Sequence, residues 1–255
     1  MHIESIPMRW GSGDNYAYLL VDDKSKHAWL IDPAEPDEVV AYLDKAGTGY
    51  ELKAIVNTHH HYDHSQGNQF FHKKYPDLPV IAGKDSPQVS YTPQDGEVID
   101  LGDSLAITAL HTPCHTQDSI CYYVSDTNTK EKAVFTGDTL FISGCGRFFE
   151  GTPKEMDYSL NKVLAKLPDA TKVYPGHEYT RSNIKFSQKV LDNDAIAALA
   201  EMAKANEHTT GKSTIGQEKQ YNPFMMLGDP QVQRATGESA REAVMGKLRE
   251  MKNNM

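Results

Sequence analysis

The chain has 255 residues, 39% of them hydrophobic and 24% charged, a composition typical of a folded globular protein with one or two domains. Its formal net charge of -9 argues against a general nucleic-acid binder and against binding to anionic membranes, because both of these partners select basic surfaces. Three cysteines without a disulfide pattern, the lack of a signal peptide and the lack of an apolar run near the ~20 residues of a membrane span predict a cytoplasmic protein.

The first part of the chain predicts short strands separated by polar turns. Residues 16–21 and 28–31 flank such a turn and predict a hairpin, and Pro36 then begins a helix that Gly47 ends. Further strands are predicted at 54–56, 80–82, 98–99, 105–110, 122–124 and 133–135, with a short helix through 69–71. The capping-box pattern at 152–155 predicts another helix, with Leu160 and Leu164 on its inner face. A last strand at 172–174 leads to Pro175-Gly176-His177.

Strand patterns stop near Glu178. Apolar residues then recur at helical spacing within 184–191, 196–203 and 240–251, and the polar stretch 209–220 is expected to be a long loop. We therefore predict a mixed α/β domain at 1–178 and a small helical domain at 179–255.

The stretch Thr58-His59-His60-His61-Tyr62-Asp63-His64 follows the strand predicted at 54–56. Four imidazoles and a carboxylate at this density have no ordinary role in a core or on a solvated surface. His59 and His61 are two residues apart, so an extended chain can point both the same way, whereas Asp63 and His64 fall where the chain turns toward a helix. The spacing therefore predicts two adjacent metal positions. His60 alternates away and is expected outside the ligand set.

Three more candidate ligands, His115, Asp138 and His177, each follow a predicted strand. Alone, each of them would more often be a structural histidine or a turn aspartate, but the histidine cluster favours a common metal-binding role for all three together. Ligands at the same end of several strands would converge on one rim of the sheets. Oxygen and imidazole ligands without thiolate suit zinc, iron or manganese.

The pattern Thr-His-x-His-x-Asp-His, followed by a distant His, a Gly-Asp and a Gly-His, resembles the metallo-β-lactamase superfamily over roughly the first 178 residues. The resemblance implies an α/β fold, a four-layer αβ/βα sandwich with a dinuclear site at the edge of two sheets, followed here by a small all-α domain. It implies that His59, His61 and His115 hold one divalent metal ion, that Asp63, His64 and His177 hold the other, and that Asp138 bridges them. Zinc is the expected ion, with iron or manganese as alternatives.

Residues 144–152, 174–180 and 221–225 further resemble the glyoxalase II family, the hydroxyacylglutathione hydrolases. The resemblance implies that Arg147, Phe149, Tyr179, Arg249 and Lys252 grip the glutathione part of a substrate. Arg147 stands where some members have Lys, and Phe149 where some have Tyr, which removes a hydroxyl group. Without the resemblance, Arg249 and Lys252 would be interpreted as a solvated helix face. A local cationic site suits the carboxylates of glutathione in a protein of net negative charge.

The expected activity is hydrolysis of the thioester S-D-lactoylglutathione to D-lactate and glutathione, with a metal-activated hydroxide as nucleophile and Asp63 orienting it. The three cysteines are not needed as nucleophiles. One alternative is a persulfide dioxygenase of the same fold with a single iron; another is a non-catalytic metal-binding protein, which would be expected to lack part of the ligand set. A small-molecule substrate is the expected partner, the chain is expected to be a monomer, and no nucleic-acid or membrane partner is expected.

Overall fold

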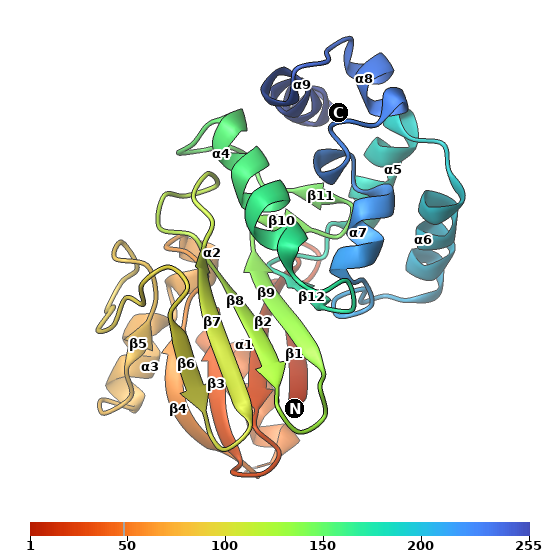
Figure 1. Ribbon diagram of the computed structural model, residues 1–255. Helices are drawn as coiled ribbons and strands as arrows, with labels where there is room; N and C mark the ends of the chain where they lie inside the picture. Colours follow the sequence, from red (N-terminus) through yellow and green to blue (C-terminus); the bar gives the residue numbers. More distant parts are fainter. Residues whose placement is uncertain (48) are drawn as a thin grey trace.

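The computed structural model describes residues 1–47 and 49–255, and two five-stranded sheets face each other in it (Figure 1). The first sheet has the strand order β1-β2-β3-β4-β5: His2–Met8, Asn15–Val21, His27–Ile31, Glu51–Val56 and Val80–Ile81. The second has the order β12-β9-β8-β7-β6: Lys172–Pro175, Lys132–Gly137, Ile120–Asp126, Leu105–His111 and Val98–Leu101. The predicted hairpin is present, since β2 pairs antiparallel with β3, with Tyr18 opposite Ile31. The strand β1 was not predicted.

Apolar side chains from both sheets form the core between them. In β7, Leu105, Ile107 and Ala109 are buried while the residues between them are only partly buried, as a strand with one inward face requires. Aromatic rings cross the gap: Tyr18 lies 5.2 Å from Phe135 between ring centroids. Fully burying a large apolar side chain stabilises the fold by about 1.5–3 kcal/mol, so this core holds the two sheets in a set register.

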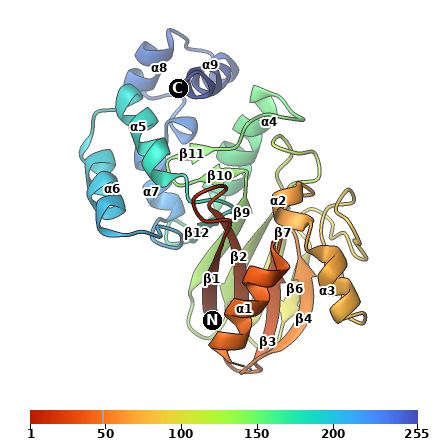
Figure 2. The ribbon, with the colours of Figure 1, turned by 180° about the vertical axis from the view of Figure 1, so that it is seen from behind.

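Helices cover the outer face of each sheet. α1 (Pro36–Ala46) and α3 (Asn68–Lys74) cover the first sheet (Figure 2). Their side chains Val39, Leu43 and Phe71 are buried in the apolar cluster on this face. On the second sheet α4 (Pro153–Tyr158) continues through a π-helical turn (Ser159–Val163) and a 3-10 turn (Leu164–Lys166), with Leu160 and Leu164 buried as predicted. The predicted capping box at its start is confirmed, because the Thr152 side chain accepts from the Glu155 amide. The four-layer α/β arrangement is therefore confirmed.

The rest of the chain is helical, as expected: α5 (Thr180–Val190), α6 (Asp194–Ala205), α7 (Ile215–Tyr221), a 3-10 turn (Pro223–Met225), α8 (Pro230–Thr236) and α9 (Arg241–Asn253). The prediction of a long loop at 209–220 was wrong, because α7 begins inside it. Thr214 and Gln217 form a capping box at the start of α7, a local pattern that the polar composition obscured. α8 was also missed, although Asp229 caps it and Pro230 occupies its first turn.

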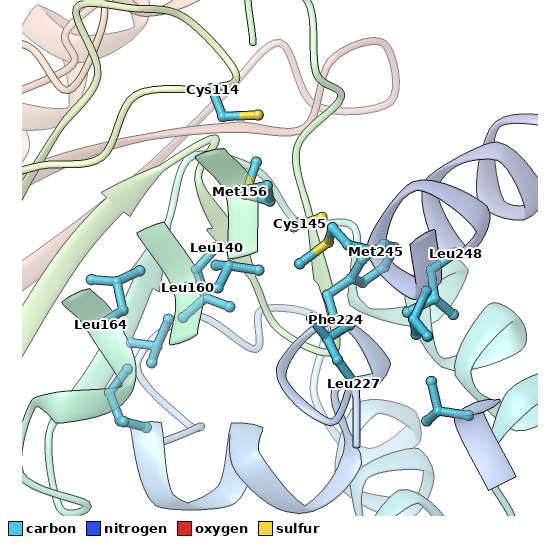
Figure 3. Packing of buried hydrophobic residues seen from close by; sticks show 14 of the residues in the cluster. Cys114, Leu140, Cys145, Met156, Leu160, Leu164, Phe224, Leu227, Met245 and Leu248 are labelled. Atoms are coloured by element: carbon cyan, nitrogen blue, oxygen red, sulfur yellow. The ribbon is translucent and has the colours of Figure 1, made fainter. Parts of the chain in front are cut away.

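The helical region packs against the sandwich through one shared apolar cluster (Figure 3). Met156, Leu160 and Leu164 come from the sandwich side, and Phe224 and Leu248 come from the helical region. The short pair β10 (Leu140–Phe141) and β11 (Gly144–Cys145), which the sequence did not predict, lies between the two (Figure 1). Among the described residues, no helix combines the length and the apolar character needed to cross a membrane.

One ionisable group is fully buried where the helical region meets β10 and β11. The carboxyl group of Glu218 on α7 accepts from the hydroxyls of Ser213 (2.6 Å) and Tyr221 (3.0 Å), from the Ser143 amide (2.9 Å) and from the Asn222 side chain (3.0 Å). Despite these donors, burial raises the pKa of Glu218 from 4.5 to about 7.

We expect Glu218→Gln to gain stability relative to the wild type as the pH rises. Between about pH 4.5 and 7 the folded protein keeps a proton on Glu218 that the unfolded chain releases, so rising pH destabilises the wild type. The glutamine side chain does not ionise. The free energy of unfolding of Glu218→Gln minus that of the wild type should therefore increase by on the order of 3 kcal/mol from pH ~4.5 to pH ~8. Urea unfolding at both pH values measures this shift, and a difference that stays constant with pH would contradict it.

Candidate active site

The seven predicted ligands lie at the ends of four strands, one in the first sheet and three in the second. His59, His61, Asp63 and His64 follow β4, the last two within the short helix α2 (Tyr62–Ser65). His115 follows β7, Asp138 follows β9 and His177 follows β12. β12 is parallel to β9, and β7 runs in the same direction because both β7 and β9 are antiparallel to β8. The three ends of the second sheet therefore meet the end of β4 on one rim, as predicted.

Three imidazoles form the first group of donor atoms. The Nδ1 atom of His61 lies 3.1 Å from Nε2 of His59 and 3.0 Å from Nε2 of His115. Burial lowers the pKa of each of these histidines, so all three are neutral at neutral pH. Each neutral ring carries only one N–H, so the converging nitrogens present lone pairs to a common point.

The second group consists of Asp63, His64 and His177. The Nε2 atoms of the two histidines lie 3.2 Å apart, and Oδ2 of Asp63 lies 3.5 Å from Nε2 of His177. Asp138 faces both groups: its Oδ1 lies 3.3 Å from Nε2 of His64, and its Oδ2 lies 3.4 Å from Nε2 of His115. Each group places its three donor atoms within 4.8 Å of one another.

Hydrogen bonds on the outer side of the rings set which nitrogen faces the centre. Nδ1 of His115 lies 2.9 Å from the Arg147 carbonyl, and Nδ1 of His177 lies 2.8 Å from the Gly13 carbonyl. A carbonyl only accepts, so both rings donate from Nδ1 and turn Nε2 toward the centre; in His115, whose pKa burial lowers, this Nε2 carries a lone pair. A hydrogen bond on the outer ring nitrogen is typical of a histidine that binds a metal ion through its other nitrogen.

The charges at the centre also fit a cation. Burial opposes a charged His64, but Asp138 and Asp32 raise its pKa well above the ordinary value. The carboxylates therefore favour a positive charge at this position. His177 and His64 in turn hold the pKa of Asp138 low against the effect of burial. Among the described residues, the buried Oδ1 of Asp138 has no hydrogen-bond partner. Nitrogen and oxygen donors in two adjacent groups therefore fit divalent ions.

Two glycines allow the strand ends to come this close. Gly137 has φ 47°, a conformation that residues with a Cβ rarely adopt, and a Cβ there would clash with the Thr58 side chain. Gly176 has no unusual φ, but a Cβ on it would clash with Oδ1 of Asp138 and with the ring of His64.

Sequence reasoning missed two residues that support the ligands. The buried carboxylate of Asp32, at the end of β3, accepts from the Thr58 amide (2.8 Å) and hydroxyl (2.7 Å) and lies 3.1 Å from Nδ1 of His64. The buried Asn15 side chain donates to the carbonyl (3.0 Å) and to Oδ2 (3.2 Å) of Asp63. Asp32 follows a predicted strand, as the candidate ligands do, so a search for His and Asp after strands could have found it. Asn15 does not follow this pattern.

A cavity of about 480 Å³ opens on the centre. All five residues expected to grip a substrate line it: Arg147, Phe149, Tyr179, Arg249 and Lys252. The Tyr179 ring stacks on His177 with centroids 4.6 Å apart, and the Phe149 ring lies edge-on to His61 at 5.7 Å. The cavity therefore combines an aromatic wall beside the histidines with a cationic far end.

Arg249 and Lys252, two of the cationic residues on α9, are not a solvated helix face. Arg249 is only 8% exposed; its Nη1 donates to the Cys145 carbonyl at 2.8 Å, and its guanidinium lies over the Phe224 ring. Lys252 donates to the Ser182 carbonyl at 3.0 Å, and burial together with Arg249 lowers its pKa to about 8. Cys145 is a buried thiol, and burial raises its pKa to about 12.

The remaining histidine of the cluster, His60, belongs to neither donor group. Its Nδ1 is 2.7 Å from Oδ1 of Asp118, although its ring lies edge-on to the His61 ring with centroids 5.2 Å apart.

Two family models together match nearly the whole chain. The model described as the metallo-beta-lactamase superfamily matches residues 10–177, and the model described as the hydroxyacylglutathione hydrolase C-terminus matches residues 178–255. With the convergent donor groups, the superfamily match supports a divalent-metal site at this rim.

Curated relatives are similar over their full lengths. The chain is 53% identical to the probable hydroxyacylglutathione hydrolase glo2 of Schizosaccharomyces pombe, over 99% of this chain and 98% of that protein. It is 48% identical to the cytoplasmic isozyme of hydroxyacylglutathione hydrolase from Saccharomyces cerevisiae, over 100% of both, and 46% identical to the mitochondrial enzyme, over 100% of this chain and 96% of that protein. Among solved structures, ETHE1 from Myxococcus xanthus superposes with a TM-score of 0.69 at 26% identity, over 97% of this chain and 90% of that one.

Asn15→Ala should loosen metal binding at the Asp63, His64 and His177 group. The variant removes the donor that orients the Asp63 carboxylate, and loss of such a supporting partner typically lowers metal affinity about 10- to 100-fold. Competition with a chelator, followed by metal analysis of the protein, measures the loss. Asn128→Ala, in an exposed turn, is the control and should behave as the wild type. Equal metal retention by Asn15→Ala and the wild type would refute a supporting role.

Proposed function

Because the chain belongs to the hydroxyacylglutathione hydrolase family of the metallo-β-lactamase superfamily, we propose that it hydrolyses S-D-lactoylglutathione and related S-2-hydroxyacylglutathiones. The products are D-lactate and glutathione, and the reaction is the second step of methylglyoxal detoxification. One observation carries the proposal: a two-part histidine and aspartate centre and a cationic pocket from the helical region open on the same cavity.

We propose that the centre holds two divalent ions, with zinc as the expected metal. His59, His61 and His115 would bind one ion, Asp63, His64 and His177 would bind the other, and Asp138 would reach both. Divalent ions held there lower the pKa of a bound water toward about 7 and polarise a carbonyl group.

Asp63 has a second proposed role beside metal binding. Its carboxylate is about one-third exposed, it faces the cavity and its pKa is lowered by His64 and His177 against the effect of burial, so it stays ionised. An ionised carboxylate there accepts a hydrogen bond from the attacking water and orients it. The departing glutathione thiolate is a good leaving group near neutral pH, so no strong general acid is required. The buried thiols take no part in this step.

The glutathione part of the substrate is expected to lie at the cationic end of the cavity. Its carboxylates would pair with Arg147, Arg249 and Lys252, and its backbone would pack along Tyr179 and Phe149. Phe149 offers no hydroxyl, so its contribution is apolar. The positive charges are local, since the chain as a whole carries a net charge of -9.

The proposed function also predicts how the chain divides into domains and where in the cell it acts. Residues 1–178 would form the catalytic domain, and 179–255 would complete the glutathione site. The similarity to a cytoplasmic isozyme supports a cytoplasmic enzyme, and a small-molecule substrate calls for neither nucleic acid nor membrane. We expect a monomer.

Turnover of S-D-lactoylglutathione by the purified protein tests the function directly. We expect loss of thioester absorbance with the metal-loaded protein, no loss after chelation, and recovery when zinc is added back. A fully metal-loaded protein that does not hydrolyse the thioester would contradict the proposal. Oxygen consumption with a glutathione persulfide would point instead to a dioxygenase.

Lys252→Ala should mainly raise KM. Both Lys252 and Arg249 donate to a backbone carbonyl, but Lys252 is the cleaner choice because it is only partly buried, whereas Arg249 is 8% exposed. Removing one charged hydrogen-bond partner of the substrate should raise KM about tenfold with little change in kcat. Lys247→Ala, which lies on the same helix and pairs with Glu250, is the matched control. An unchanged KM for Lys252→Ala would remove this residue from the proposed grip.

A further inference from the structure

The segment from β10 through β11 to Arg147 connects the helical region to the metal centre. After β9 the chain forms β10, turns and returns as β11 (Figure 1). Ile142 and Ser143 form the turn, and Cys145, Gly146 and Arg147 line the cavity. We call residues 140–147 the connecting hairpin. Its turn points into the helical region, and its last residues line the cavity.

Buried side chains of the helical region bind consecutive backbone groups of this hairpin. The carbonyls of residues 142–145 accept, in order, from Asn183 (3.1 Å), Ser187 (3.2 Å), Asn222 (3.0 Å) and Arg249 (2.8 Å). All four side chains are buried. Backbone groups in an irregular turn need such partners once they are out of water, so the helical region determines where the turn lies.

Glu218 binds this turn from the other side. Its Oε2 accepts from the Ser143 amide at 2.9 Å and from the Asn222 side chain at 3.0 Å, and the same Asn222 amide donates to the Gly144 carbonyl. One carboxyl oxygen thus fixes Ser143 directly and Gly144 through Asn222. Ser143 has φ 58°, which is unfavourable for a residue with a Cβ, so the turn needs these bonds to keep its shape.

The far end of the hairpin touches both parts of the active site. The Arg147 carbonyl accepts from Nδ1 of His115, and the Cys145 carbonyl accepts from Arg249. Gly146 lies directly against Asp138 and the His115 ring, where no Cβ fits. A displaced hairpin would therefore move one ligand of the metal centre and one cation of the cavity together.

We propose that Glu218 is a positioning residue for the hydrolysis: through Ser143 and Asn222 it holds the connecting hairpin, and the hairpin holds His115 and Arg249 in place. This inference rests on the proposed function for its kinetic part, but not for its metal-binding part. It assigns the helical region a second task beside the substrate grip, namely support of the His59, His61 and His115 group.

The test compares Glu218→Ala with Glu218→Gln. The alanine variant should release zinc to a chelator about tenfold more readily and show a raised KM, because it leaves the Ser143 amide without its acceptor. The glutamine variant keeps an oxygen toward Ser143 and Asn222, while its amide can donate to the hydroxyls of Ser213 and Tyr221. It should therefore restore both values to near those of the wild type.

Asn193→Ala controls for general destabilisation, since Asn193 caps α6 in the same region and has no bond to the hairpin among those described. It should lower the melting temperature without changing zinc release or KM. Equal zinc release and KM for Glu218→Ala and the wild type, or equal losses in Asn193→Ala, would overturn the proposal. If Glu218→Ala does not fold, Ser187→Ala, which removes the hydroxyl that binds the Ser143 carbonyl, decides by the same criteria. A wild type that binds zinc but does not turn over would refute the proposed function alone.

Discussion

The structure depends on one constraint. At the centre, buried nitrogen and oxygen atoms face one another with too few hydrogen atoms between them to form hydrogen bonds. Nδ1 of His115 and Nδ1 of His177 each donate to a carbonyl behind the ring, so both Nε2 atoms face the centre, and the neutral His115 presents a lone pair there. Leaving such groups unpaired costs of the order of 1–3 kcal/mol each, and buried charges cost more. A bound divalent cation would remove this cost, so the same residues that are unfavourable when left unpaired suit the centre to metal binding.

Because its ligands come from both sheets, the centre exists only when the sheets pack in one register. Two buried tyrosine hydroxyls hold that register. Tyr18 in the first sheet donates to the Pro175 carbonyl at the end of β12, at 2.6 Å, and Tyr122 in the second sheet donates to the Asn57 carbonyl after β4, at 3.1 Å. Each bond ties a strand of one sheet to a ligand-bearing end in the other, two residues from His177 in the first case and two from His59 in the second. The packing of the core between the two sheets therefore also determines where the donor residues of the centre lie.

The helical region acts on this centre through contacts of two kinds. Lys252, at the end of α9, borders the cavity directly, whereas Glu218, Asn222 and Ser187 reach it only through the connecting hairpin. Arg249 belongs to both, because the same guanidinium lines the cavity and binds the hairpin. The proposed substrate grip and the proposed support of His115 would therefore be coupled at this residue.

Much of the fold and the whole set of converging donors could be predicted from sequence, because both depend on local features. A strand that ends before His59 or Asp138 is visible from neighbouring residues, and so is the two-residue spacing of His59 and His61. The sequence by itself thus determined which residues are the candidate donors. Local spacing predicted two adjacent metal positions, and the resemblance to the metallo-β-lactamase superfamily implied how the residues divide between them. The support of Asp63 by Asn15, 48 positions away, and of Thr58 by Asp32, 26 positions away, was decided only by tertiary structure. The burial of Arg249 and the place of Glu218 against the hairpin were decided in the same way, since hydrogen bonds between distant segments follow from how sheets and helices pack and leave no local pattern.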